Sequence, residues 1–179
     1  MKCGWVQTEF KRFDPQSYIV DANDKSFVCR PRLRPPDWNA SSWLCLEIQR
    51  HSYTPKSITR ISNQIASYLY DGSLIGKCYP AVQTLFCLMD TRNLQSFRGK
   101  DTLGEFHWWL VDIETDEIFD PTVAQYDELG IEPPYADGKK CNWYGFRPFI
   151  QKRSMNVIHD LQPSSKFHKV KDLSELKSL

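Results

Sequence analysis

The segment FHWWLVDIETDEIFDPT, residues 106–122, brings together one of the four histidines of the chain, two adjacent tryptophans and a closing Asp-Pro-Thr. Its polar ETDE sequence predicts a turn between two strands, at about residues 105–113 and 117–120. With a two- or four-residue loop, paired residue numbers in a hairpin sum to an odd value, which places Asp120 on the same face as His107. An aspartate bonded to one ring nitrogen would fix the imidazole tautomer, and the other nitrogen would exchange a proton with a nucleophile.

A cysteine at the start of a predicted helix could supply that nucleophile. The sequence GKCYPAVQTLFCLMD, residues 76–90, predicts a helix with an apolar stripe, and its proline suits a first turn. Cys78 would begin this helix, where unpaired backbone N–H groups and the positive end of the helix dipole favour the thiolate over the thiol. Cys87 lies about 900° of helical rotation further on, so we expect it to be buried and to point away from Cys78. The apolar stripe consists of Val82, Leu85, Phe86 and Met89.

Each member of this candidate triad also has a structural interpretation. Cys78 could be a small buried residue, His107 a packing residue of a strand, and Asp120 the cap of the turn that Asp-Pro begins. Asp112 is a poorer partner for His107, because the two have opposite parity on one strand and so point to opposite faces. The catalytic interpretation is favoured because the hairpin brings Asp120 and His107 together.

Length and charge limit the class of protein. The chain has 179 residues, which suits one domain, and 23 Lys and Arg against 22 Asp and Glu leave a net charge of +1. That balance gives no general attraction to nucleic acid or to an anionic membrane. No apolar run reaches the roughly 18 residues of a membrane span, and MKCGWVQTEF lacks the apolar stretch of a secretory signal. We therefore expect a soluble, cytoplasmic protein without membrane association.

The cysteines are expected to be reduced thiols. Without an export signal or a CxxC pair, and in a chain long enough to build a core, disulfides are disfavoured. Each thiol would then be a free side chain whose surroundings decide its chemistry. The six cysteines occupy positions 3, 29, 45, 78, 87 and 141.

Further elements must position the triad. Thr54 as N-cap and Pro55 at the first helical position predict a helix that precedes Cys78. A short helix is expected over residues 123–129, and a last strand in NWYGFRPFI, residues 142–150. The first of these helices would pack through the apolar positions Ile58, Ile61, Ile65, Tyr68 and Leu69.

We predict a single domain over residues 1–179. Residues 1–40 mix short apolar stretches with turn signals and a proline-rich end, so we expect them to form an irregular arm. Residues 41–160 would form the core. The Lys- and Ser-rich residues 161–179 would form a mobile tail or a weakly attached helix.

A cysteine at a helix start, a histidine on an aromatic-rich strand and Asp-Pro-Thr after a hairpin turn follow one another in GKCYPAV, HWWLVD and IFDPT. This order, within residues 76–122, resembles the core of the transglutaminase-like superfamily of papain-like cysteine enzymes. The resemblance implies an α+β fold in which the helix that carries the nucleophile packs on an antiparallel sheet. It also implies the catalytic triad Cys78, His107 and Asp120 without a cofactor, and calcium activation is not expected because an acidic calcium site is missing. A weaker resemblance is to small uncharacterised phage-encoded proteins with the same His-Trp and Asp-Pro-Thr layout and a Lys-Arg-Ser segment, here QKRS.

These residues predict acyl transfer through a thioester, with a protein or peptide amide as substrate. The Cys78 thiolate would attack the carbonyl carbon, and His107 would protonate the leaving group. Water as acceptor would make the protein a peptidase, amidase or deamidase, and an amine would make it a transglutaminase. Candidate oxyanion donors are the backbone N–H of Cys78 and the side chains of Trp109 and Gln64. The residues expected to contact substrate are Tyr79, Trp108 and Trp109.

The main alternative is an inactive protein-binding module, an inhibitor or adaptor on the same fold. Large aromatic side chains often anchor such partners. The residues that would do so here are Trp143, Tyr144 and Phe146.

Two further alternatives use residues near the end of the core. The same aromatics, followed by Arg147, Lys152 and Arg153, are typical of single-stranded nucleic-acid binding, against which the near-neutral charge argues. A zinc site lacks the close paired ligand spacing of structural zinc sites, so we expect no metal. Its ligands would be Cys78, His107, Asp120 and Cys141.

Overall fold

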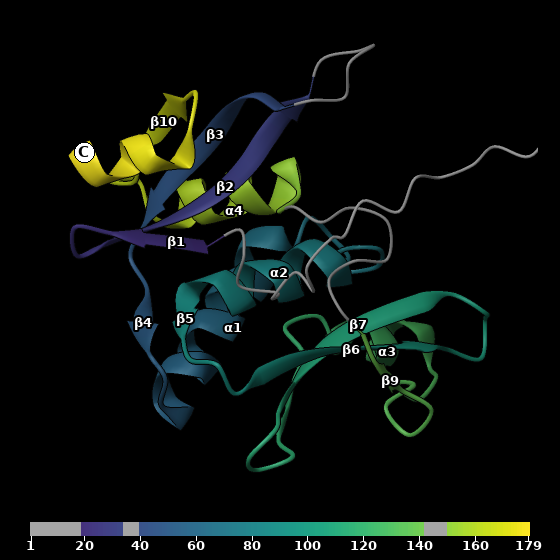
Figure 1. Cartoon of the computed structure of the whole chain (residues 1–179). Helices are drawn as coiled ribbons and strands as arrows, with labels where there is room; N and C mark the ends of the chain where they lie inside the picture. Colours follow the sequence, from purple (N-terminus) through teal and green to yellow (C-terminus); the bar gives the residue numbers. More distant parts are fainter. Residues whose placement is uncertain (1–18, 34–39, 142–149) are drawn as a thin grey trace, which may run out of the picture.

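The computed structural model describes residues 19–33, 40–141 and 150–179, and over these residues the protein combines helices with sheets (Figure 1). Two four-stranded sheets are antiparallel throughout, and the long helices lie between them. The predicted α+β class is therefore confirmed. Within the described residues, no helix has the length and apolar character that crossing a membrane requires.

The first sheet is built in the order β1 (Ile19–Ala22), β2 (Lys25–Leu33), β3 (Ala40–Ile48) and β10 (Phe167–Val170). Asn23 and Asp24 join β1 to β2 with positive φ angles of 50° and 58°, which a two-residue hairpin turn favours. The expected irregular arm is therefore wrong for residues 19–33, which form two paired strands. The predicted tail, residues 161–179, contains the strand β10, which pairs with β3 and was not predicted, and then the 3-10 helix η2 (Leu173–Ser178).

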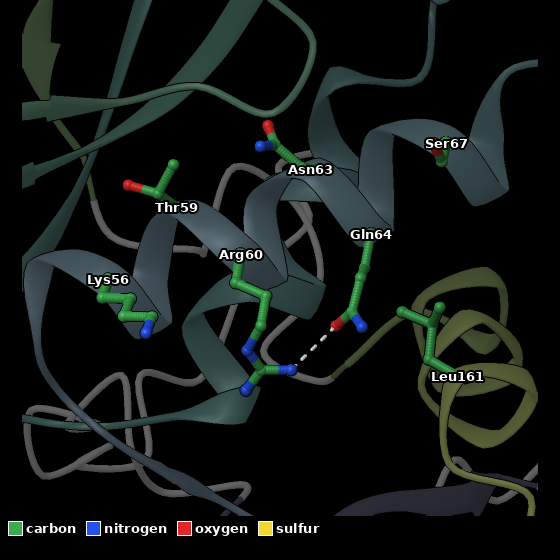
Figure 2. A pocket seen from close by; sticks show the side chains of 7 residues that line it. All are labelled: Lys56, Thr59, Arg60, Asn63, Gln64, Ser67 and Leu161. Carbon is green, nitrogen blue, oxygen red and sulfur yellow. Dashed lines mark hydrogen bonds between the residues drawn. The ribbon is translucent and has the colours of Figure 1, made fainter.

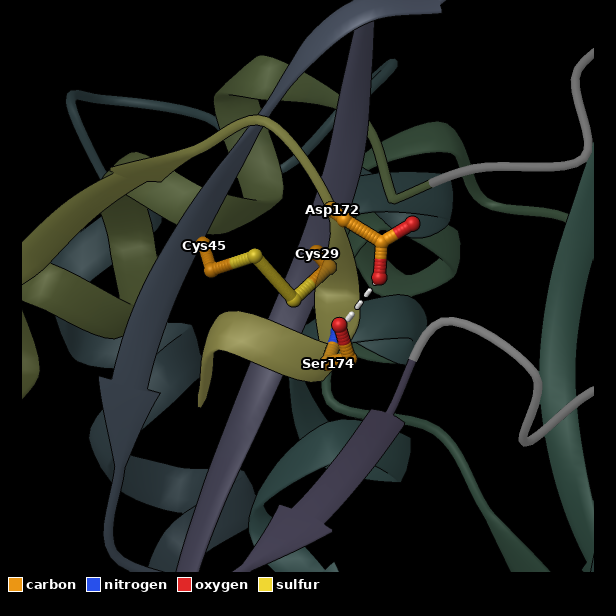
Figure 3. The surroundings of a disulfide bond; sticks show 4 residues. All are labelled: Cys29, Cys45, Asp172 and Ser174. Atoms are coloured by element: carbon orange, nitrogen blue, oxygen red, sulfur yellow. Dashed lines mark hydrogen bonds between the residues drawn. A yellow bond between two sulfur atoms is a disulfide. The ribbon is translucent and has the colours of Figure 1, made fainter. Parts of the chain in front are cut away.

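A disulfide joins Cys29 of β2 to Cys45 of β3, which are direct partners across the two strands (Figure 3). The expectation that all cysteines are reduced is wrong for this pair, because strand pairing brings their Cα atoms to 4.1 Å from each other. Both side chains are fully buried, and η2 covers them through Leu176, which belongs to the same apolar cluster.

Helix α1 (Pro55–Leu69) begins where the sequence predicts. The Thr54 side chain accepts a hydrogen bond from the Ser57 N–H at 3.1 Å, and proline occupies the first turn. Tyr68, expected on the apolar stripe, is instead 44% exposed and bonds to Asp160 of α4 (Lys152–Leu161), a helix that the sequence analysis missed. The buried stripe of α1 consists of Ile58, Ile61, Ile65 and Leu69.

Helix α2 (Cys78–Leu88) contacts α1, α4 and strand β7 (Phe106–Asp112). Cys78 is its first residue, as predicted, and Cys87 is fully buried, as predicted. Because α2 contacts both neighbouring helices and the second sheet, the helix is packed on several sides.

The second sheet has the order β8 (Ile118–Phe119), β7, β6 (Leu94–Lys100) and β9 (Lys139–Lys140). Leu110 pairs with Phe119 across β7 and β8, so the residue numbers have the odd sum that the hairpin analysis predicts. The predicted short helix is α3 (Ala124–Leu129). The small parallel pair β4 (His51–Ser52) and β5 (Met89–Asp90) completes the described elements. The strand predicted in residues 142–150 lies almost wholly outside the described residues.

Candidate active site

His107 and Asp120 meet on one face of the second sheet, as the hairpin parity predicts. The Nε2 of His107 lies 2.5 Å from the Oδ2 of Asp120, and each side chain is 2% exposed. The register of β7 and β8 accounts for this, because it places position 120 opposite Trp109 and so on the face of His107. A carboxylate this close stabilises a protonated imidazole through a charge-assisted hydrogen bond.

The second carboxylate oxygen of Asp120 is held by the turn that follows it. Its Oδ1 accepts hydrogen bonds from the N–H of Thr122 at 2.9 Å and from the Thr122 hydroxyl at 3.0 Å. The hydroxyl of Tyr135 donates to Oδ2 at 2.8 Å. Asp120 therefore caps its own turn and binds His107 at the same time, so the two interpretations of this residue are compatible.

Cys78 is held at the N-terminus of α2 by the preceding lysine. The side chain of Lys77 is 9% exposed and donates to the carbonyl oxygens of Leu69 at 2.6 Å and Ser73 at 2.7 Å, and it also pairs with Asp71. These bonds tie the end of α1 and the connecting loop to the residue that precedes the nucleophile. Rotation of the loop would break several bonds at once, which fixes the position of Cys78.

The thiol of Cys78 lies beside the strand that carries His107. Its Sγ is 3.9 Å from the carbonyl oxygen of Phe106, and the side chain hydrogen-bonds to His107. Burial lowers the pKa of His107, but hydrogen bonds and charge from Asp120 and Cys78 outweigh it and raise this pKa to about 9. The contacts of His107 with Asp120 and Cys78 therefore favour its protonated form.

Asp112 serves a different part of the sheet, as its parity predicts. Burial works to raise its pKa, but hydrogen bonds from the Tyr53 hydroxyl and from the backbone N–H groups of Glu114 and Thr115 outweigh burial and lower the pKa. Asp112 therefore joins the turn between β7 and β8 to Tyr53, which directly follows β4 in the chain.

Three further side chains surround the imidazole, and the sequence analysis missed two of them. The ring of Trp109 stacks on His107 with centroids 5.9 Å apart, and the ring of Tyr126 meets it edge-on at 4.9 Å. The Nε2 of Gln125 lies 3.1 Å from His107 Nδ1. Gln125 and Tyr126 belong to α3, directly after Asp-Pro-Thr, and this closeness in sequence is the one signal that pointed to them.

Trp109 packs against His107 from the protein interior and does not line the surface of the site. It is 1% exposed and also stacks on Phe97 at 6.3 Å. Its indole occupies the space that two glycines leave: a Cβ on Gly138 would lie 2.2 Å from Trp109 Cζ2, and one on Gly99 would lie 3.1 Å from Cη2. With so little exposed surface, Trp109 positions His107 and offers substrate almost no contact.

Trp108 and Tyr79 lie on the opposite side of β7 from His107. Their rings meet edge-on with centroids 4.8 Å apart, and both belong to the large apolar cluster around α2. Trp108 is 8% exposed, whereas Tyr79 is half-buried. Of the residues expected to contact substrate, Tyr79 retains the clearest exposed surface and directly follows Cys78.

Gln64 lies elsewhere on the molecule. It is exposed on α1 and lines an open hollow of about 630 Å³ with Arg60 and with Leu161 of α4 (Figure 2). Its Oε1 accepts a hydrogen bond from Arg60 at 3.4 Å, and among the described residues no bond joins it to Cys78. The structure therefore does not bring this candidate oxyanion donor to the triad.

The described part of the chain contains no cluster of side chains suited to the alternative of a zinc site. No group of three or more His, Cys, Asp or Glu residues there could hold a metal ion. Cys141 instead contacts the carbonyl oxygen of Ser96 at 3.6 Å, and burial raises the pKa of its thiol. The expected aromatic anchors at positions 143, 144 and 146, and Arg147, lie outside the described residues.

Comparison with known proteins adds no relative to this geometry. The chain matches no protein-family model, no curated protein and no solved structure.

Proposed function

We propose that the protein catalyses cysteine-dependent acyl transfer, or hydrolysis of an amide or peptide bond, through a thioester at Cys78. One observation carries the proposal: His107 interacts with Cys78 and, 2.5 Å from its Nε2, with Asp120. A nucleophile, a base and a group that orients the base are the three parts that such chemistry needs. The same order of helix, strand and aspartate supports a transglutaminase-like core.

In the acylation step, the Cys78 thiolate forms a bond to the carbonyl carbon and the carbonyl oxygen takes the negative charge. The imidazolium of His107 then gives its proton to the nitrogen of the leaving amine as the C–N bond breaks. The negative charge of Asp120 stabilises the imidazolium before this transfer. The products are a thioester on Cys78 and a free amine.

In the second step, water or an amine resolves the thioester. His107, now neutral, takes a proton from the attacking group as its oxygen or nitrogen bonds to the acyl carbon. The C–S bond breaks with its electron pair on sulfur, and His107 keeps the proton, so the resting pair of Cys78 and His107 forms again. Water gives hydrolysis and an amine gives transfer.

The N-terminus of α2 supplies a candidate donor for the oxyanion. The Cys78 N–H is at the first position of the helix, where no carbonyl one turn earlier is available, and it finds no hydrogen-bond partner among the described residues. Donation from a helix N-terminus stabilises a developing oxyanion through both the hydrogen bond and the helix dipole.

An inactive protein-binding module is the second candidate, and the exposure of two neighbouring residues favours it. Cys78 is 7% exposed, whereas Phe106, whose carbonyl oxygen lies 3.9 Å from Cys78 Sγ, is 50% exposed. The guanidinium of Arg98 and the ammonium of Lys100 lie 4.3 and 5.2 Å from the centre of that ring. An aromatic ring flanked by cations is a suitable anchor for a protein partner.

Mass spectrometry separates the two candidates. We expect limiting iodoacetamide at neutral pH to label Cys78 first, and activated esters or amides to leave an acyl adduct on Cys78. Cys78→Ala should abolish the adduct while the fold is retained, and Cys87→Ala, on the same helix but remote from His107, should keep it. Preferential labelling of another cysteine, with no acyl adduct from any donor, would contradict catalysis. In that case Phe106→Ala, and not Cys78→Ala, should remove partner binding.

A further inference from the structure

The side chain of Gln125 makes the remaining ring contact of His107. It is 5% exposed, and its Nε2 lies 3.1 Å from His107 Nδ1, 3.0 Å from the carbonyl oxygen of Thr122 and 3.2 Å from the Thr122 hydroxyl oxygen. A backbone carbonyl can only accept, so the amide nitrogen, and not the amide oxygen, must face Thr122. The same nitrogen then points an N–H at His107.

This orientation fixes the role of His107 Nδ1. A nitrogen that receives an N–H donor must be an acceptor, so this hydrogen bond forms only in the neutral ring whose Nδ1 carries no proton. The hydrogen of the neutral ring is then on Nε2, where it donates to Asp120 at 2.5 Å. Gln125 and Asp120 thus select the same tautomer from opposite sides of the ring.

We propose that Gln125 is a positioning residue that stabilises His107 with Nδ1 unprotonated, and so promotes proton release from this nitrogen to the leaving group. The inference rests on the proposed pair of Cys78 and His107. While Nδ1 is protonated, two donors face each other and the Gln125 contact is lost. Once the proton has left, the amide bonds the vacated lone pair.

The other groups around His107 do not replace this effect. The contacts of His107 with Asp120 and Cys78 both raise its pKa and so favour the imidazolium. The phenol of Tyr126 faces the ring from α3, and burial together with the charge of Asp101 raises its pKa, so it is neutral at neutral pH.

Tyr135 faces the site from the loop before β9 and is neutral for the same reason. Burial and the charge of Asp120, to which it donates, raise its pKa. Among the described neighbours, Gln125 is therefore the polar side chain whose hydrogen bond favours the deprotonated Nδ1.

Gln125→Met tests the proposal, since methionine keeps the length of the side chain and removes its donor. We expect the pH midpoint of His107 protonation, followed by ¹⁵N NMR of the ring, to rise by about 0.4 to 1 pH unit, the range that one net hydrogen bond supplies. The alkaline limb of the acylation rate should move upward by a similar amount. A merely structural role would lower the melting temperature and leave both midpoints unchanged.

Gln83→Met is the matched control. Gln83 is a second buried glutamine, and its Oε1 accepts from the Gln151 N–H at 2.9 Å and the Ser154 hydroxyl at 2.7 Å, away from His107. An equal midpoint shift in the two variants, or none in either, would overturn the proposal. Should Gln125→Met fail to fold, the wild-type protein decides: the side-chain amide signals of Gln125 must change together with the His107 titration, and constant signals reject the inference.

Failure of the proposed function gives a different result. If no donor acylates Cys78 but the His107 midpoint responds to Gln125→Met as expected, catalysis is rejected, whereas the effect of Gln125 on the protonation of His107 stands.

Discussion

Both four-stranded sheets bury one face in the large apolar cluster around α2, and they differ in what they bury on the other face. The sheet of β1, β2, β3 and β10 covers one face with an apolar cluster and a buried disulfide between Cys29 and Cys45. The sheet of β6 to β9 instead buries a polar network around His107 and Asp120. Apolar burial needs only area, whereas polar burial stabilises only when each group has its hydrogen-bond partner.

The polar network of the second sheet meets that requirement closely. His107 uses both ring nitrogens, and the two oxygens of Asp120 accept from His107, Thr122 and Tyr135. Such a network specifies one arrangement of its members, because any other leaves a buried group unpaired. Beyond the shared core, the first sheet therefore adds apolar burial and a cross-link, whereas the second sheet fixes the placement of a few polar side chains.

The largest effect is expected from substitution of Asp120, which disrupts the polar network of the second sheet. In Asp120→Asn, Oδ1 can still accept from Thr122, but the amide nitrogen would donate to His107 Nε2 and force the ring hydrogen onto Nδ1, against Gln125. We expect acylation to fall by about 10⁴-fold, as when a triad aspartate becomes an amide. Single-turnover acylation measures the rate.

The matched comparison is Asp120→Ala, which removes the turn cap as well and should lower both the rate and the melting temperature. If Asp120→Asn were nearly fully active and Asp120→Ala were only less stable, Asp120 would be a cap, and the site would be reduced to Cys78 and His107.

The contact of Asp120 with His107 in the second sheet could be predicted from the sequence because the two residues are close in the chain. The hairpin of β7 and β8 spans a short stretch, so parity alone placed Asp120 beside His107. The helix starts at Pro55 and Cys78 were predicted equally well, since capping residues and first-turn prolines act within a few positions.

The first sheet was missed because its pairing depends on distant segments. β3 pairs with β10 more than one hundred residues later in the chain, and no local pattern announces that partner. The disulfide follows from the register of β2 and β3, which places Cys29 opposite Cys45 and which spacing alone does not fix. Asn23 and Asp24 were the local signal that was overlooked, since such residues favour two-residue hairpin turns.

The disulfide between Cys29 and Cys45 should contribute to stability without affecting the nucleophile. Replacing Cys29 and Cys45 together with alanine should lower the free energy of unfolding by about 2 to 4 kcal/mol, because the cross-link no longer restricts the unfolded chain. Urea unfolding of the double variant measures this loss. The rate of Cys78 alkylation in the folded protein should stay the same, because helices separate the two sheets (Figure 1). A fall in that rate would show that the first sheet also positions the nucleophile.

The smallest expected effect concerns the packing beneath His107. In Gly138→Ala, the new methyl group would lie 2.2 Å from Trp109 Cζ2 and 2.6 Å from Cη2, so the indole must move. Trp109 stacks on His107, and its displacement should shift the imidazole away from Asp120. We expect a loss of about 1 to 3 kcal/mol in unfolding free energy, typical of overpacking, together with slower acylation. Gly104→Ala is the control: its new methyl group meets open space, but its φ of +85° strains the backbone. Gly104→Ala should be less stable than the wild type but should acylate at the normal rate. If Gly138→Ala acylated as fast as Gly104→Ala, Trp109 would not position His107.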